Sequence, residues 1–184
     1  MQMRMIIAII TTWITSTAFA GEAPLGAQVY LDADAYVTQT FSGSVPTVKT
    51  VWPTGELRSE LQGILGHRPA LRFKYWGANG KTVWVLDEVG KDRPITAAVV
   101  INQGKIEDVQ VLVFRESRGW EVKYNFFTRQ FADLWLRSSN DLSGHIDNIT
   151  GATLSVKAMT RMAKAALKLH EHSNQSIQSL AHAR

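Results

Sequence analysis

The residues most capable of a specific chemistry lie in one short stretch, DNITGATLS, at residues 147–155. The stretch directly precedes the longest helical pattern in the chain, so its hydroxyl groups are expected at a helix N-terminus. The free backbone N–H groups and the dipole of such a terminus favour an anion, above all a phosphate. Thr153 places a hydroxyl there to which a phosphate can be ester-linked, and Gly151 and Ala152 leave room beside it.

A helix cap is the structural alternative for the same stretch. A threonine hydroxyl can accept a hydrogen bond from a backbone N–H of the first helical turn, which is worth about 1 kcal/mol. A cap accounts for one hydroxyl but not for a second threonine three residues further on. It also leaves Gly151 unexplained, because a glycine usually marks a positive φ or the close approach of another group.

The rest of the sequence contains no other pattern with a specific chemistry. It lacks a His-Glu-x-x-His metal motif, a Gly-x-Ser-x-Gly nucleophile elbow and the glycine-rich loops that bind nucleotides. His170 and His172 flank Glu171 at the end of a helical pattern, where polar and cationic groups are favoured in any case. The chain has no cysteine, which excludes disulfides, thiolate-held iron–sulfur clusters and thioether-linked haem.

The N-terminus has the pattern of a secretory signal peptide. Arg4 is its only charge, residues 5–14 are mainly apolar, and Ala18-Phe19-Ala20 supplies small residues at the −3 and −1 positions of a cleavage site. A retained membrane anchor is the alternative, but the apolar run is short for a spanning helix. We therefore expect export to the periplasm, with cleavage after Ala20.

Bulk composition is that of a globular domain. The 184 residues are 45% hydrophobic and 20% charged, with a net charge of +4. The basic residues are scattered, so the sequence does not indicate a nucleic-acid-binding surface.

The hydrophobic patterns predict an α+β fold with a mainly antiparallel sheet. Helices are expected over residues 29–41 and from Thr54 to Gly66, and a short one within residues 124–136. Strands are expected in an alternating pair at residues 71–75 and 82–87, then at residues 94–101 and 106–114.

An amphipathic helix is predicted after Thr153, and its apolar face should pack on the sheet. Its other face carries basic side chains that we expect to form a solvated surface: Lys157, Arg161, Lys164 and Lys168. After Glu171 the chain turns polar, and a frayed end is expected.

The pattern Asp147-x-x-Thr150-Gly151-Ala152-Thr153-x-Ser155 resembles the flavinylation motif of FMN-binding domains. These domains include subunits of the sodium-translocating NADH:quinone reductase and of the Rnf-type electron-transport complex. The resemblance implies that Thr153 carries FMN through a phosphoester, installed by a flavin transferase that uses FAD and a divalent metal. Asp147 aligns with the aspartate that the transferase requires, Thr150, Gly151 and Ala152 match the motif core, and Ser155 matches a common hydroxyl position.

The resemblance extends from about Thr82 to Leu169 and implies surroundings for the flavin ring. Glu116 and Gly119 lie where the family has a Glu-Thr-Pro-Gly segment, although Arg118 replaces the proline. Trp120 stands where a small aliphatic residue is usual, and either stacking on the ring or burial in the core would explain it. His145, two residues before Asp147, completes the expected ring surroundings.

These expectations define a soluble, exported flavoprotein. Its parts are a signal peptide at residues 1–20, a helical segment at 21–69, an FMN-binding domain at 70–172 and a polar tail at 173–184. The expected role is that of an electron carrier between membrane-bound and soluble redox partners. Two alternatives stay open. One is a flavin enzyme that reduces a small exported substrate, for which no histidine–arginine–carboxylate constellation is evident in the sequence. The other is a flavin-free binding or regulatory module.

Overall fold

The computed structural model describes residues 26–182, with side chains through residue 175. The predicted signal peptide therefore lies outside the described residues. Within residues 26–182, none of the helices combines the length and apolar character that crossing a bilayer requires.

A six-stranded antiparallel sheet forms the centre of the fold, as predicted. Strands β3 to β6 follow one another as a meander, and two short strands from the N-terminal segment complete its edges, in the order β1-β6-β5-β4-β3-β2. Their bounds are β1 Gln28–Val29, β2 Lys49–Val51, β3 Phe73–Ala78, β4 Lys81–Val89, β5 Pro94–Asn102 and β6 Lys105–Phe114.

Two tight turns fix the register of the meander. Asn79 and Gly80 connect β3 to β4, and Gln103 and Gly104 connect β5 to β6; all four have positive φ. Positive φ at both central residues is the geometry that two-residue hairpins need to match strand twist.

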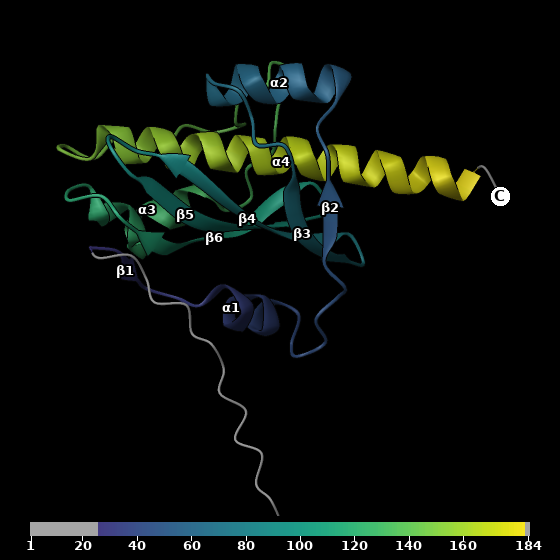
Figure 1. Ribbon diagram of the computed structural model, residues 1–184, viewed down its shortest axis with the longest axis horizontal. Helices are drawn as coiled ribbons and strands as arrows, with labels where there is room; N and C mark the ends of the chain where they lie inside the picture. Colours follow the sequence, from purple (N-terminus) through teal and green to yellow (C-terminus); the bar gives the residue numbers. More distant parts are fainter. Residues whose placement is uncertain (1–25, 183–184) are drawn as a thin grey trace, which may run out of the picture.

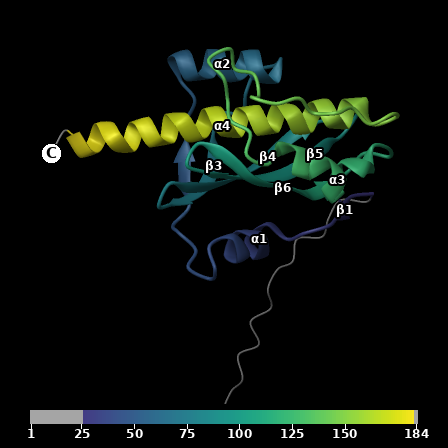
Figure 2. The ribbon, with the colours of Figure 1, turned by 180° about the vertical axis from the view of Figure 1, so that it is seen from behind.

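Helices cover both faces of the sheet (Figure 1). Helix α4 (Thr153–His182) packs on one face and α2 (Gly55–Leu65) packs against α4, while α1 (Ala33–Thr40) lies on the opposite face. The view from behind shows the same separation of α1 from α4 (Figure 2). The larger core lies between the sheet and α2/α4, and the smaller one beneath α1.

Two expectations about the elements were wrong. The first helix begins only at Ala33, where Asp32 accepts a hydrogen bond from Ala35 N–H at 2.9 Å, and Val29 belongs to β1 instead. Helix α4 continues to His182 instead of fraying after Glu171. The helical segment expected at residues 21–69 contains α1 and α2 and also supplies β1 and β2.

The segment expected as one short helix, residues 124–136, instead contains two shorter ones, α3 (Asn125–Thr128) and the 3-10 helix η2 (Arg129–Phe131), and a further 3-10 helix, η1 (Trp120–Lys123), precedes them. These short helices, β1 and the N-terminus of α4 gather at one end of the molecule, and the C-terminus of α4 lies at the other (Figure 1).

Candidate functional site

A tight turn leads directly into α4. Ala152 N–H donates to the carbonyl of Ile149 at 2.9 Å, and Gly151 occupies the third position of this turn with φ +84°. A type II turn requires a positive φ at that position. A Cβ added to Gly151 would meet no atom within 4 Å, so the backbone conformation, and not a close approach, explains this glycine.

Thr153 is the first residue of α4, and its side chain is exposed. Asn148 Nδ2–H donates a hydrogen bond to Thr153 Oγ1 at 3.0 Å. The first backbone hydrogen bond of the helix runs from Val156 N–H to the carbonyl of Ala152 at 3.0 Å. The N–H groups of Thr153, Leu154 and Ser155 precede that bond and are the donors that a helix N-terminus offers to an anion.

Neither threonine of the motif caps α4 in the structure. Among the hydrogen bonds of the described residues, neither Thr150 nor Thr153 accepts from an N–H of the first turn of α4. Thr150 is exposed in the turn. Both hydroxyls are therefore available for a role other than capping.

The loop after β6 packs tightly against the start of α4. A Cβ added to Gly119 would lie 2.3 Å from Ser155 Oγ and 3.5 Å from the Cα of Ala152. Ser155 is 4% exposed and Ala152 is 2% exposed. Gly119 and Ser155 thus join the loop to the helix by close packing.

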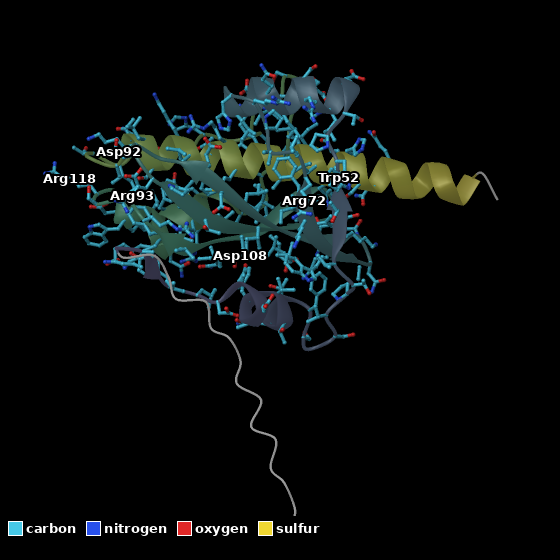
Figure 3. The ribbon with its side chains drawn as sticks, in the orientation of Figure 1. Trp52, Arg72, Asp92, Arg93, Asp108 and Arg118 are labelled. Atoms are coloured by element: carbon cyan, nitrogen blue, oxygen red, sulfur yellow. The ribbon has the colours of Figure 1, made fainter. Side chains whose placement is uncertain are left out.

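Glu116 holds a second loop beside the site. Its Oε1 accepts hydrogen bonds from the backbone N–H groups of Lys91, Asp92 (2.7 Å) and Arg93 (3.0 Å), in the turn between β4 and β5. Three donors on one carboxylate oxygen fix both the turn and the side chain. Figure 3 places Asp92, Arg93 and Arg118 at the end of the molecule where α4 begins.

Thr153 lies between two cavities of about 600 Å³ and 620 Å³, within the usual size range of small-molecule sites. The first, here called the loop cavity, is lined by Lys91, Glu116, Ser117, Arg118 and residues 151–155. The second, here called the α4 cavity, runs along the helix. Its lining consists of Asp141, Leu142, Gly144, His145, Ile146, Asn148, Thr153, Val156, Lys157, Thr160, Arg161 and Lys164.

The residues expected around the flavin ring are distributed over different places. Glu116 lines the loop cavity, His145 lines the α4 cavity, and Gly119 lies beneath Ser155. Trp120 is in the lining of neither cavity. At 42% exposure it is not a core residue, so the core explanation for this tryptophan was wrong. Its ring contacts Tyr124 edge to face at 5.7 Å.

Asp147 is held by its backbone. Its N–H donates to Gln130 Oε1 at 2.8 Å, while its carboxylate is exposed and lies 3.8 Å from His145 Nε2. Gln130 thereby ties the turn region around η2 to the segment that precedes Thr153.

Two interactions at this end of the fold were missed from the sequence. One is the hydrogen bond of Asn148, which lies inside the motif stretch at a position that the motif leaves open. The other is a cluster around the buried Glu88, which pairs with His67 Nε2 at 3.0 Å and with Arg161 Nη2 at 2.9 Å. The backbone carbonyl of Arg68, followed by Glu88, raises the pKa of His67. The cluster joins the segment after α2, strand β4 and helix α4.

The basic face of α4 is less solvated than expected. Arg161, Lys164 and Lys168 pair with Glu88, Asp141 and Glu60, each at 2.9–3.0 Å. Lys164 holds the pKa of the Asp141 carboxyl below its usual range. Lys157 alone of the four is exposed and has no ion pair among the described residues.

Residues 90–168 match the family model described as FMN-binding domain. This range includes β5, β6, the Glu116 loop and the first half of α4 with Thr153. Neither the curated proteins nor the solved structures contain a significant match to the chain. The fold and the site thus define an α+β domain with an exposed threonine at a helix N-terminus. Over residues 90–168 the chain is similar to FMN-binding domains.

Proposed function

We propose that this protein is an exported electron-transfer flavoprotein that carries FMN in phosphoester linkage to Oγ1 of Thr153. The observation that supports the proposal best is the position of this hydroxyl. It is exposed, stands at the first residue of α4, and opens on two cavities. A helix cap would need this oxygen turned toward the helix N–H groups, whereas here it accepts a hydrogen bond from Asn148.

The chain's own groups fit the phosphate of FMN. Lys91 and Arg118 line the loop cavity together with the first residues of α4, and three backbone N–H groups precede the first helical hydrogen bond. The helix terminus contributes roughly 0.3–1 kcal/mol toward an anion. That is far too little to retain a dissociable cofactor, so a covalent bond has to provide the retention.

The attachment is a transfer reaction with balanced products. A bond forms between Thr153 Oγ1 and the flavin-side phosphorus of FAD, the pyrophosphate bond breaks, AMP leaves and the hydroxyl proton is released. A flavin transferase with a divalent metal performs this step. The exposed carboxylate of Asp147 is available for recognition by that enzyme, and charge repulsion makes a contact with the phosphate unfavourable.

Bound FMN would supply one- and two-electron transfer. Export gives the covalent linkage its purpose, because a chain that is exported unfolded cannot retain a non-covalent flavin, and a dissociated flavin would be diluted in the periplasm. Membrane-bound and soluble redox proteins are the proposed partners. The family match disfavours the flavin-free module, while a direct reduction of a small substrate remains the second candidate because the α4 cavity adjoins Thr153.

Intact mass of the protein co-produced with a flavin transferase in the same compartment tests the proposal. The wild type is expected to gain one FMN that survives denaturation, and Thr153→Ala is expected to gain none while keeping its fold. Thr150→Ala is the matched control, since it removes a neighbouring exposed hydroxyl and should retain FMN. Asp147→Ala should be loaded less completely. Loading of Thr153→Ala, or a wild type that never gains the mass, would overturn the proposal.

A further inference from the structure

The α4 cavity is a second cavity at Thr153, and the cations proposed to bind the phosphate of FMN line the other one. One part of its wall is apolar, with Leu142 and Val156 each 7% exposed and Ile146 packed against the core. Another part is cationic, because Lys157, Arg161 and Lys164 follow one another at intervals of four and three residues on α4. Residues at such spacing share one side of a helix.

The cationic part of the wall keeps unused binding capacity. Lys164 is paired with Asp141, and Arg161 uses Nη2 for Glu88 and for the carbonyl of Val89. The Nη1 of Arg161, however, makes no hydrogen bond among the described residues and, unlike its Nε, is not buried. A ligand in the cavity can therefore accept a charge-assisted hydrogen bond from this nitrogen. Lys157 adds a charge without an ion pair among the described residues.

We propose that the α4 cavity binds a small organic carboxylate with an apolar body. The carboxylate would provide an acceptor for Arg161 and a counter-charge for Lys157, and the body would lie against Leu142, Ile146 and Val156. Guanidinium groups match the planar carboxylate, and an apolar wall with a few polar groups is the usual composition of a small-molecule site. Because Thr153 lines the same cavity, the ligand lies beside the residue that carries the flavin; this proximity to the flavin rests on the proposed function, whereas the binding itself does not.

The probes are cinnamate and cinnamamide, which share one apolar body and differ in charge. Calorimetric titration of protein that has never met flavin should give saturable binding of cinnamate at one site. The amide should bind at least about tenfold more weakly, a difference of about 1.4 kcal/mol. Equal affinities for acid and amide, or no saturation by cinnamate up to about 10 mM, would overturn the proposal.

Two charge-removing variants locate the site. Lys157→Gln should weaken cinnamate binding several-fold, and Lys74→Gln, which removes an exposed cation from β3, should leave it unchanged. Lys157 is the better target than Arg161, because loss of Arg161 would remove an ion pair of the buried Glu88 and destabilise the fold. A weakening by Lys74→Gln equal to that by Lys157→Gln would contradict the assignment.

Titration of FMN-loaded protein with cinnamate is the remaining measurement. If the proposal is correct, loading leaves a cinnamate site and binding perturbs the flavin absorbance spectrum. If FMN loading abolishes cinnamate binding, the flavin ring occupies the α4 cavity and the proposal is overturned. A wild type that cannot be loaded would remove the proposed function but not the binding measured on flavin-free protein.

Discussion

Asn148 holds the hydroxyl of Thr153 in one orientation, which makes it a positioning residue for the attachment of FMN. The hydrogen bond to Oγ1 leaves the hydroxyl proton directed away from Asn148. Asn148→Ala removes that constraint, and we expect the rate of FMN attachment to fall about tenfold, because loosely oriented reacting groups lose part of the rate that positioning provides.

A time course of intact mass with purified transferase and FAD measures this rate. Asn125→Ala serves as the control, since it removes an exposed asparagine of α3 without touching Thr153. Urea denaturation should show that both variants keep near wild-type stability. Identical loading curves for Asn148→Ala and wild type would assign the hydrogen bond no role in positioning.

Gly119 packs the loop against α4, and its replacement tests that packing. Gly119→Ala combines a positive φ of 84° with a Cβ placed 2.3 Å from Ser155 Oγ. Gly104→Ala has a similar φ of 79° but open space around the new Cβ. We expect the control to lose about 1–2 kcal/mol from backbone strain, and Gly119→Ala to lose roughly 1–3 kcal/mol more from overpacking. Urea denaturation measures the free energy of unfolding of both variants. Equal losses would mean that the loop moves away from α4 at no cost in free energy.

At the scale of elements, a buried polar network fastens the C-terminal part of α4 to the sheet. His170 is 1% exposed, its Nδ1 lies 2.7 Å from Thr82 Oγ1, and Trp84 Nε1–H donates to the same oxygen at 2.9 Å. On the other side of the ring, Nε2 lies 2.9 Å from the side-chain amide of Asn174. Burial lowers the pKa of His170 to about 4.

This histidine makes stability depend on pH. In the unfolded chain His170 has its ordinary pKa of 6.5, whereas in the folded chain its pKa is about 4. The contribution is therefore complete above pH 6.5 and is lost progressively as the pH falls to 4, by about 3 kcal/mol. In His170→Gln the free energy of unfolding should fall less steeply over this window. Urea denaturation at pH 7 and pH 4.5 measures the difference, and parallel pH profiles would contradict it.

His67 acts in the opposite direction. Its pKa is raised, so its pairing stabilises the fold fully below pH 6.5 and loses this contribution as the pH rises through the folded value. Its side chain is 54% exposed, so solvent screening keeps the effect small.

The elements were largely predictable because their signals are local. Alternation in β3 and β4, the apolar run of β5 and the stripe of α2 each specify one element within a few residues. The first helix was predicted too long, because apolar residues before Asp32 serve the β1 edge strand and not a helix face. Edge strands of two or three residues are too short to show a period.

Side-chain pairing was the part that the sequence could not provide. Glu88 and Arg161 lie 73 residues apart, and only the packing of α4 on β4 brings them within 2.9 Å. Thr153 was identifiable because a motif surrounds it, whereas Asn148 required the turn geometry to place it against Oγ1. Trp120 was expected to stack on the flavin ring or to lie in the core, because large aromatic residues usually do one or the other. Its exposure results from the short turns that follow Gly119.

At the scale of the whole molecule, the N-terminal segment closes the sheet face that α4 leaves open. Tyr36 and Val37 of α1 are buried against Val83, Ala98, Val100 and Leu112. Tyr36 also donates a hydrogen bond from its hydroxyl to Asp108 Oδ2 at 2.6 Å. The family match begins only at residue 90, so this cover lies outside the matched part of the chain.

Val37→Asp tests whether α1 is required as a cover. Val37 is 1% exposed, and an unpaired carboxylate placed there costs several kcal/mol, about 3–5 by comparison with broken buried ion pairs. We expect α1 to detach, the apolar face to bind 1-anilinonaphthalene-8-sulfonate, and the protein to associate on size-exclusion chromatography. Gln39→Asp, which adds the same charge at an exposed position of α1, should stay monodisperse with unchanged dye fluorescence.

Because Thr153 stands at the N-terminus of a helix on the opposite face, the Val37→Asp protein that remains folded should still gain FMN. Equal dye binding by the two aspartate variants would show that the sheet does not depend on α1.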